Sequence, residues 1–145
     1  MGRIPRSGGL VNYKIDHIGI AVRSISETVA FYLKTFGGRA SEVFESKTDK
    51  VRVQFIYYDR QRLEFLEPTS PDSPIAKFLS AKGPGLHHFC FGVTDIAAEL
   101  ARLKEEGYWL IDEVPRLGAE GKKIAFLHPK SSAAILIELK ETKDS

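Results

Sequence analysis

Two histidines and two glutamates stand at matching places in the two halves of this sequence. His17 lies in "DHIGIAV" and His88 lies in "HHFCFGV", 88 − 17 = 71 positions later. Glu64 and Glu138 lie in the similar phrases "LEFLEP" and "LIELKE", where apolar residues flank each acid. Because an unpaired buried carboxylate is costly, an acid inside an apolar strand calls for a partner. If the two halves pair about a twofold axis, all four side chains converge on one point.

This set of side chains suits a divalent first-row cation. Imidazole nitrogens and carboxylate oxygens bind Co, Ni, Mn, Fe and Zn without selecting sharply among them. Four protein ligands leave two positions of an octahedron open, and open positions are typical of a catalytic metal. We therefore predict a divalent metal ion bound by His17, Glu64, His88 and Glu138.

Each of the four residues also has an ordinary structural interpretation. A strand histidine is more often a hydrogen-bonded structural residue than a ligand, and alternation can place a strand acid on a wet face. The metal site is favoured only because all four residues occupy matching positions in the two copies of the repeat. His87 should point to the opposite face of its strand from His88, and His128 in "FLHPKS" is expected in a turn or on the surface.

The repeat that relates the two histidines extends over most of the chain. The same shift of 71 positions aligns Ser24 with Asp95, and both are favoured N-cap residues that follow an apolar strand. After each expected helix come three β-rich runs, which are 41–46, 51–58 and 61–68 in the first copy and 109–114, 122–129 and 133–141 in the second. The sequence thus predicts an α+β fold made of two paired βαβββ modules.

The predicted domain covers residues 13–142. Module one spans 13–69 and module two spans 86–141, and the linker 70–85 carries a short helix that Pro71 and Pro74 open and Gly83–Pro84–Gly85 end. Residues 1–12 contain no apolar core of a signal peptide and are expected to form a flexible N-terminal lead-in.

Composition and charge narrow the possible partners. The net charge is only +2 and the basic residues are interspersed with acids, so a nucleic-acid partner is not expected. The single Cys90 rules out a disulfide framework and a cysteine-based zinc site, and favours a reducing cytoplasm. No apolar run approaches the length of a membrane span. We expect a cytoplasmic protein that acts on a small molecule.

Four stretches of the chain resemble one known family. "IDHIGIAV", "FLEPTSPDSPIAKFL", "GLHHFCFGV" and "EVPRLGAEGKKIAFLHPKSSAAILIEL" resemble the methylmalonyl-CoA epimerases of the vicinal oxygen chelate superfamily, from about Tyr13 to Lys140. The resemblance implies a cupped eight-stranded mixed sheet around a metal ion, commonly in a homodimer. It also implies the metal ligands named above, although some members have Gln where this chain has Glu64.

The resemblance further implies an isomerase that moves a proton at the α-carbon of an acyl-CoA thioester, with methylmalonyl-CoA as the expected substrate. It implies that Glu138 is one general base. The family's other base, a glutamate, aligns with Val53, which cannot carry a proton. Since pseudo-symmetry places Glu64 across the metal from Glu138, we take Glu64 as the candidate for the second acid/base.

An acyl-CoA substrate also needs contacts for its phosphates. Arg116, Lys122, Lys123 and Lys130 lie in or beside the segments "RLGAEGKK" and "HPKS" and are candidates for this role. The counter-argument is that surface lysines are common and that the loop lacks a phosphate-cradling pattern.

Three other functions share this fold and stay open. The first alternative is a glyoxalase I-type lyase (lactoylglutathione lyase), because Glu64 makes the ligand set similar to that of glyoxalase I. A dioxygenase is less favoured, because an iron oxygenase usually has two histidines and one carboxylate. A metal-free binding module would not need four convergent ligands.

Overall fold

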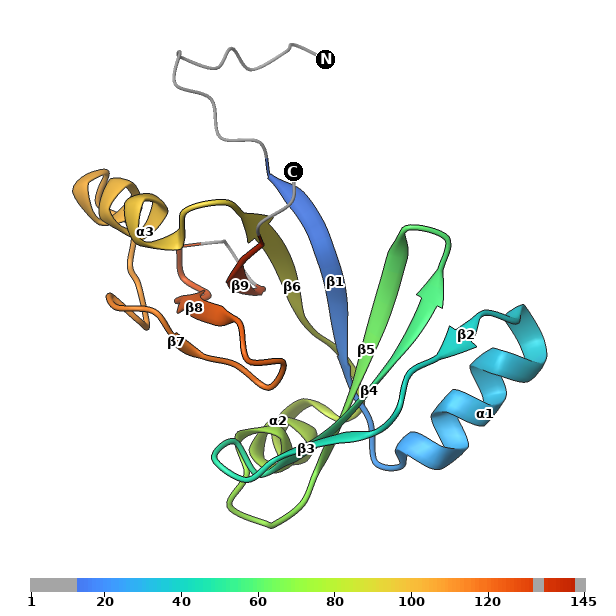
Figure 1. Cartoon of the computed structure of the whole chain (residues 1–145). Helices are drawn as coiled ribbons and strands as arrows, with labels where there is room; N and C mark the ends of the chain where they lie inside the picture. Colours follow the sequence, from blue (N-terminus) through green and yellow to red (C-terminus); the bar gives the residue numbers. More distant parts are fainter. Residues whose placement is uncertain (1–12, 132–134, 143–145) are drawn as a thin grey trace, which may run out of the picture.

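One mixed β-sheet forms the frame of the molecule, and three helices pack on it (Figure 1). The computed structural model describes residues 13–131 and 135–142, so the predicted lead-in 1–12 lies outside the described residues. The strands of module one are β1 (Lys14–Ala21), β2 (Arg39–Ala40), β3 (Phe44–Ser46), β4 (Val51–Tyr58) and β5 (Gln61–Pro68). Those of module two are β6 (Gly85–Val93), β7 (Arg116–Leu117), β8 (Lys123–Leu127) and β9 (Leu136–Glu141).

The sheet joins the two modules through their first strands. Its order is β2-β4-β5-β1-β6-β9-β8-β7, and β3 also pairs with β4. At the centre, β1 and β6 run antiparallel, and each is parallel to the last strand of its own module, β5 or β9. The predicted α+β fold of two paired modules is confirmed.

The register of the strands repeats from one module to the other. The residue two positions after each candidate histidine pairs with the candidate glutamate, so Gly19 pairs with Glu64 and Cys90 pairs with Glu138. Because side chains on alternate strand residues share a face, this register puts each histidine on the same face as its glutamate. The fold therefore carries two copies of one His–Glu unit to the middle of one sheet.

Each helix begins where its capping residue predicts. Helix α1 (Ile25–Phe36) starts after Ser24, whose side chain accepts a hydrogen bond from the backbone N–H of Glu27. Helix α3 (Ile96–Glu105) starts after Asp95 in the same way. Helix α2 (Pro74–Lys82) lies in the linker, follows Ser73, and ends at Gly83 with a φ of 78°. These caps satisfy N–H groups that would otherwise lack partners at the helix ends.

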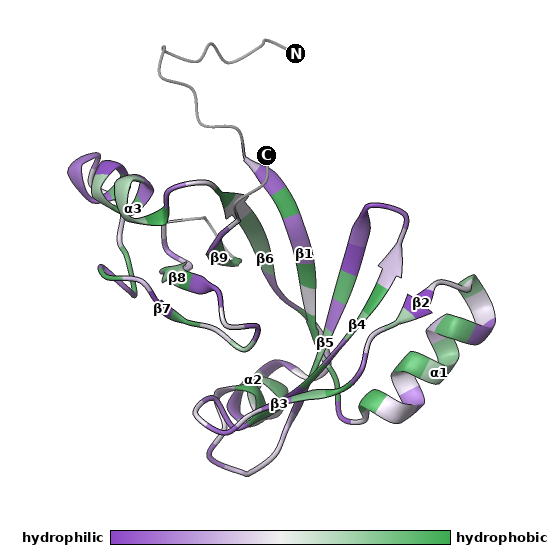
Figure 2. Cartoon of the chain, in the orientation of Figure 1, coloured by the Kyte–Doolittle hydropathy of each residue, from purple (hydrophilic) through white to green (hydrophobic). Residues whose placement is uncertain are grey.

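Three apolar clusters hold the helices on the sheet, and Figure 2 shows apolar and polar residues alternating along the central strands. Along β4, Val53 and Phe55 face α2, whereas Ile56 faces α1. Helix α3 packs on module two. The buried members of its cluster are Val93, Ile96, Leu100, Leu103, Leu110, Ala125, Leu127 and Leu139. Helix α1 packs on Phe65 and α3 packs on Leu139, which are the strand neighbours of Glu64 and Glu138 and so lie on the opposite face. These two helices therefore leave the face of the candidate glutamates uncovered, and α2 packs beside it.

Two details of the strands differ from the sequence prediction. The run 41–46 forms only β3 at its end, while β2 lies just before it, and both pair with β4; the sheet therefore has nine strands rather than eight. The predicted strand 109–114 is wrong. Within it Leu110 makes a single bridge to Leu127, and the next paired strand is the short β7. In that segment Trp109, Ile111 and Val114 are exposed, so the β-type residues have no sheet to cover.

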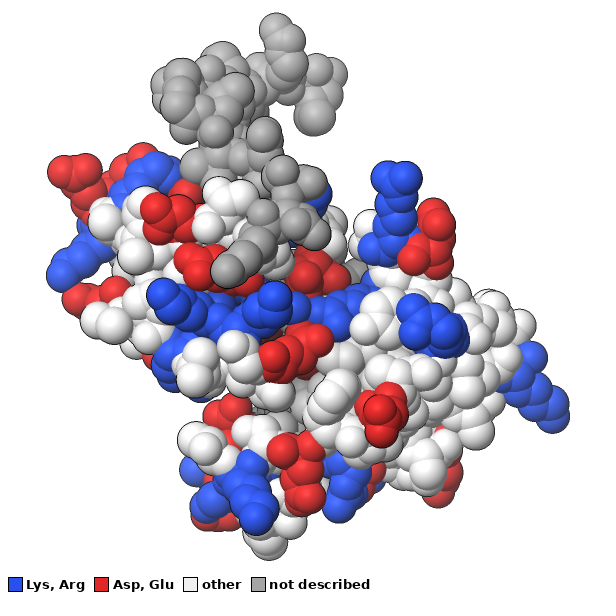
Figure 3. Space-filling model, viewed as in Figure 1, with Lys and Arg blue, Asp and Glu red and all other residues white. Residues whose placement is uncertain are grey.

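Basic and acidic side chains are neighbours on the face drawn in Figure 3, where a band of Lys and Arg has Asp and Glu on both sides. None of the helices in the described part of the chain is long and apolar enough to cross a membrane.

A partly buried hydrogen bond links Tyr13, the residue before β1, to α3 and gives a test of the fold. The hydroxyl of Tyr13 donates to Oε1 of Glu99 at 2.5 Å, and Glu99 is 4% exposed. Burial and this contact raise the pKa of Tyr13 to about 12, so the phenol stays a donor. We expect Tyr13→Phe to lower the free energy of unfolding by about 1.5 kcal/mol, because a hydrogen bond to a charged group is lost. Urea denaturation measures the change.

The matched control is Tyr108→Phe, because Tyr108 is 45% exposed and its hydroxyl makes no hydrogen bond within the described residues. This variant should stay within about 0.5 kcal/mol of the parent. Equal stability of the two variants would show that the Tyr13–Glu99 contact contributes nothing.

Candidate metal centre

The four predicted ligands meet at one point between the modules. The Nε2 atoms of His17 and His88 lie 3.1 Å apart. Oε1 of Glu64 lies 3.2 Å from both of these nitrogens. Oε1 of Glu138 lies 3.3 Å from Nε2 of His17 and 3.0 Å from that of His88. The residues come from β1, β5, β6 and β9, so both modules contribute one imidazole and one carboxylate.

The spacing of these donor atoms suits one small cation. Bonds of about 2.0–2.2 Å from a metal to nitrogen or oxygen place neighbouring ligand atoms about 2.8–3.6 Å apart, from octahedral to tetrahedral geometry. The separations between the two imidazoles, and between each imidazole and each carboxylate, are 3.0–3.3 Å and fall within this range. The donor atoms of His17, His88 and Glu138 all lie within 4.8 Å of one another, and Glu64 lies beside both imidazoles. Two nitrogens and two oxygens form a donor set that Zn, Co, Ni, Mn and Fe accept.

The electrostatics of the site also favour a positive charge at its centre. All four side chains are buried, and Oε1 of Glu64 has no hydrogen-bond partner among the described residues. Burial opposes ionisation of Glu64 and Glu138, but the adjacent imidazoles outweigh it and hold the pKa of both carboxyl groups below the usual range. Burial lowers the pKa of His88, but Glu138 and Glu64 raise it to about 9. A divalent cation would satisfy the unpaired oxygen and both negative charges.

Two irregularities in the β1–β6 pairing orient the imidazoles. The register shifts between Ile15 and His17 and again between Gly19 and Ile20, and the extra residues there are Asp16 and His87. These two residues are also 87 − 16 = 71 positions apart, so the irregularities obey the repeat. A bulge turns its extra residue and re-aims a side chain. In module one the bulge lets Asp16 reach His17, and in module two it lets His87 reach His88.

Each extra residue holds the far nitrogen of the next imidazole. Oδ2 of Asp16 lies 2.7 Å from Nδ1 of His17, and Nδ1 of His87 lies 2.9 Å from Nδ1 of His88. With a proton on each Nδ1 of His17 and His88, both Nε2 lone pairs point to the centre of the site. Burial, followed by the charge of His88, lowers the pKa of His87 to about 4, so its ring stays neutral and accepts this proton.

The prediction for His87 is therefore wrong, because simple alternation does not hold at a bulge. Sequence reasoning missed both orienting residues. Their signal was present in the dipeptides "DH" and "HH" at equivalent positions of the repeat, which place a proton acceptor directly before each ligand histidine.

Gly19 gives His88 the room it occupies. A Cβ atom built on Gly19 would lie 2.1 Å from Cε1 of His88, well inside the contact distance of real side chains. Gly19 pairs directly with His88 in the sheet, so neither backbone can move aside alone. The equivalent position in module two is Cys90, a fully buried residue that lies beside His17, and burial raises the pKa of its thiol to about 12.

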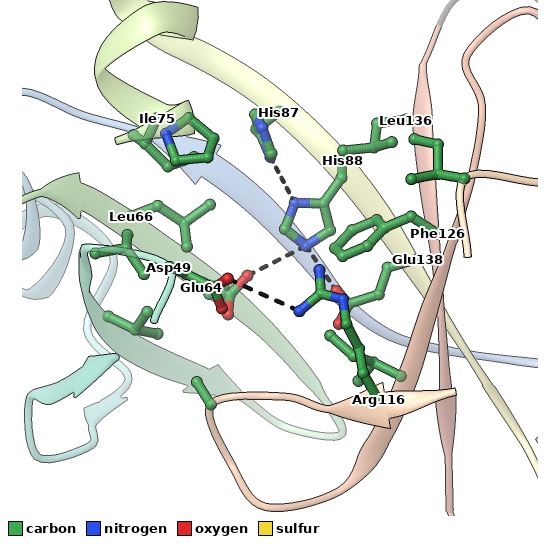
Figure 4. A pocket seen from close by; sticks show the side chains of 16 residues that line it. Asp49, Glu64, Leu66, Ile75, His87, His88, Arg116, Phe126, Leu136 and Glu138 are labelled. Carbon is green, nitrogen blue, oxygen red and sulfur yellow. Dashed lines mark hydrogen bonds and ion pairs between the residues drawn. The ribbon is translucent and has the colours of Figure 1, made fainter. Parts of the chain in front are cut away.

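An apolar cavity of about 240 Å³ opens onto one side of the four ligands (Figure 4). Val53, Leu66, Ile75 and Leu136 lie on its walls, and Glu64, His88 and Glu138 lie at its inner end. Val53 thus faces the cavity from β4, which is where the resemblance expects a glutamate. Arg116 is the one Lys or Arg among the described residues that line this cavity.

The structure separates Arg116 from the other predicted phosphate contacts. Lys122 lines a different pocket, on the other side of the ligands. Lys123 is exposed in β8, and Nζ of Lys130 lies 5.2 Å from the centroid of the Trp109 ring. His128 stacks on the same ring at 4.2 Å, consistent with the predicted surface turn. Arg116 therefore lines the apolar cavity, whereas Lys122 lines a smaller pocket that also contains His17, Glu64 and Glu138.

The chain is similar to proteins of one superfamily. The family model described as "Glyoxalase/Bleomycin resistance protein/Dioxygenase superfamily" matches residues 16–126. The Bacillus subtilis protein YqjC is 41% identical over 130 residues, 90% of this chain and 93% of that protein. The mitochondrial methylmalonyl-CoA epimerase of Dictyostelium discoideum is 37% identical over 130 residues, 88% of this chain and 78% of that protein.

A solved structure supports the same relationship. A variant of the Streptomyces coelicolor methylmalonyl-CoA epimerase, in complex with 2-nitronate-propionyl-CoA, superimposes with a TM-score of 0.85. The two sequences are 35% identical, and the match covers 89% of this chain and 94% of that one.

The close approach at Gly19 gives a test of the ligand geometry. We expect Gly19→Ala to displace the His88 ring and to weaken the binding of a divalent cation by roughly 10–100-fold, because a ligand loses its orientation. Isothermal titration with Zn²⁺ or Co²⁺ measures the affinity. Gly92→Ala is the control, since a Cβ there would lie 3.2 Å from Cγ2 of Thr142 and needs only a small adjustment. Equal affinities in the two variants would contradict the role of His88.

Proposed function

The chain belongs to the Glyoxalase/Bleomycin resistance protein/Dioxygenase superfamily, and we propose that it is a metal-dependent epimerase of acyl-CoA thioesters, with methylmalonyl-CoA as substrate. The observation that carries this proposal is the convergence of two imidazoles and two carboxylates at the inner end of an apolar cavity. The resemblance of nearly the whole chain to methylmalonyl-CoA epimerases supports the choice of substrate.

We propose that His17, Glu64, His88 and Glu138 hold the cation. The donor set admits Co, Ni, Mn, Fe or Zn. A divalent cation bound there would supply Lewis acidity, which favours the enolate form of a thioester by stabilising negative charge on its oxygen.

Two carboxylates on different sides of the site would move the proton. Glu138 comes from β9 in module two, and Glu64 comes from β5 in module one. For one epimer, Glu138 breaks the α-C–H bond and keeps the proton, while the carboxylic acid form of Glu64 returns a proton to the opposite face. The two residues exchange these roles for the other epimer, so the proton count balances over a cycle in both directions.

Val53 supports the assignment of the second base to Glu64. The Val53 side chain is 2% exposed and lies on the cavity wall, where it can shape the acyl pocket but cannot bind a proton. Apart from Glu64 and Glu138, the one acidic residue among the described residues that line the cavity is Asp49. Its Oδ1 atom lies 3.7 Å from Nη1 of Arg116. Glu64 is therefore our candidate for the second base.

Arg116 is our candidate for binding the free carboxylate of the substrate. Its Cζ atom lies 5.5 Å from the centroid of the Phe126 ring, and Nε lies 3.5 Å from Oδ1 of Asp112. These contacts aim the guanidinium across the cavity, as Figure 4 shows. A guanidinium can bind a carboxylate through two parallel hydrogen bonds, which suits a malonyl group.

The remaining proposals concern the rest of the substrate and the surroundings of the protein. Lys122, Lys123 and Lys130 stay candidates for the phosphates of the CoA portion, outside the acyl cavity. We further propose a homodimer, as the resemblance implies, and a cytoplasmic location, which the single buried Cys90 favours.

Separate measurement of hydrogen exchange and epimerisation tests the two bases. In deuterated water, with one epimer of methylmalonyl-CoA, we expect Glu138→Gln to lose both processes for the epimer that Glu138 deprotonates. Glu64→Gln should still exchange the α-proton of that epimer through Glu138, but should epimerise it at least 100-fold more slowly, because general acid catalysis is lost. NMR follows deuterium incorporation, and circular dichroism follows the change of configuration.

Full epimerisation by Glu64→Gln would contradict the role of Glu64, and full activity of Glu138→Gln would contradict that of Glu138. Both variants must first be shown to bind the cation, since glutamine keeps one oxygen donor. A separate assay, with methylglyoxal and glutathione, tests the glyoxalase-type alternative. Turnover of a methylglyoxal–glutathione mixture, with no exchange in methylmalonyl-CoA, would replace the epimerase proposal by a lyase.

Arg116→Gln should separate substrate binding from chemistry. We expect KM for methylmalonyl-CoA to rise by roughly 10-fold or more, because a charge-assisted hydrogen bond contributes about 1.5–3 kcal/mol. Steady-state kinetics measures the effect. Lys104→Gln is the control with the same change of charge, since Lys104 pairs with Glu113 on the surface. An unchanged KM in Arg116→Gln would remove Arg116 from the site.

A further inference from the structure

The two ends of the inner face of the sheet have opposite character. Leu66 lies two positions after Glu64, and Leu136 lies two positions before Glu138. Because β5 and β9 run in opposite directions, both leucines lie on the face of the glutamates and toward the same end of the sheet, where they line the apolar cavity. In the other direction lie Arg62 and Lys140, which line a different pocket. The pseudo-twofold axis makes these ends equivalent as backbone, so only the side chains distinguish them. One end is the apolar cavity, and the other is filled with charge.

Four side chains form a closed ion cluster at the charged end. Nη2 of Arg62 lies 2.8 Å from Oδ2 of Asp16 and 2.9 Å from Oε1 of Glu120. Nζ of Lys140 lies 3.2 Å from Oδ2 of Asp16 and 2.7 Å from Oε1 of Glu120. Both cations are thus shared between the same two carboxylates. The cluster joins β1 and β5 of module one to β9 and the loop before β8 in module two.

Asp16 joins the cluster to the candidate metal centre. Oδ2 of Asp16 accepts from both cations, and it also lies 2.7 Å from Nδ1 of His17. We propose that Arg62, Lys140 and Glu120 are positioning residues: they hold Asp16 on His17, and thereby set the orientation and donor strength of one metal ligand. This inference rests on the proposed metal centre. Within the described residues, no ion cluster of this kind surrounds His87, the partner of His88.

Glu120 decides the charge of the cluster. The four residues sum to zero, with two cations and two anions, beside a site that must accept a dication. Without Glu120, the cluster would carry one net positive charge and its cations would lose their second anchor. Both effects act against binding of a cation at His17, one by repulsion and the other by loosening Asp16. A backbone turn, in which Gly121 N–H donates to Gly118 C=O at 3.0 Å, places Glu120 over the cations.

A purely structural clamp between the modules makes a different prediction. Buried ion pairs that only join two segments change the stability of the protein when broken, and leave a distant binding site as it was. The distinction can therefore be measured as metal affinity, together with the stability of the metal-free protein.

The test uses the full chain and three variants that each remove one negative charge. Glu120→Gln and Asp16→Asn keep the shape of the side chain, and Glu113→Gln is the control because Glu113 pairs with Lys104 on the surface. Titration with Co²⁺ gives the dissociation constant, and the visible absorption bands of bound Co²⁺ report the ligand geometry. We expect Asp16→Asn to weaken Co²⁺ binding by roughly 10–100-fold and Glu120→Gln by roughly 5–10-fold, with Glu113→Gln unchanged.

The double variant shows whether Glu120 acts through Asp16. If it does, the loss of Co²⁺ affinity in the variant with both Asp16→Asn and Glu120→Gln should be smaller than the product of the two single losses, because only the repulsion from the unpaired cations remains. Additive losses, or affinities and Co²⁺ spectra that match the parent while only the melting temperature of the metal-free variants falls, would overturn the inference. Failure of the parent chain to bind Co²⁺ would instead refute the proposed metal centre itself, so the two failures are distinguishable.

Discussion

The antiparallel pairing of β1 with β6 is the constraint on which the site depends. It is the contact between the two modules at the centre of the sheet, and it brings the Nε2 atoms of His17 and His88 to 3.1 Å. The parallel partners β5 and β9 then deliver Glu64 and Glu138 to the same point through one repeated register. Four buried polar groups this close together form a candidate site for a cation, because burial of the carboxylates without a compensating charge is costly.

Departures from regular strand geometry make this pairing chemically useful. The two bulges turn Asp16 and His87 onto the Nδ1 atoms of His17 and His88, and at Gly19 there is no side chain to block His88. The backbone of the two modules follows a pseudo-twofold axis, but the side chains at the two ends of the inner face do not. Leucines leave one end of the inner face open to an acyl group, while Arg62, Lys140 and Glu120 close the other with paired charges.

Much of this could be read from the sequence, because its signals were local or repeated. The N-caps Ser24 and Asp95 predicted the starts of two helices, and the 71-residue repeat brought His17 and His88 together before any contact was known. The absence of a strand at 109–114 could not be predicted, since β-type residues also occur in exposed segments without a partner strand. His87 and the Asp16 cluster were missed because bulges and ion pairs between distant strands depend on register, which a single sequence does not display.

The central claim is that one divalent cation joins the two modules through four side chains. Anomalous diffraction at the cobalt edge, from crystals of the chain grown with Co²⁺, tests it most directly. We expect one strong peak at about 2.0–2.2 Å from Nε2 of His17, Nε2 of His88, and one carboxylate oxygen each of Glu64 and Glu138. Fully occupied cobalt at other residues, or no peak at these four despite saturating Co²⁺, would contradict it.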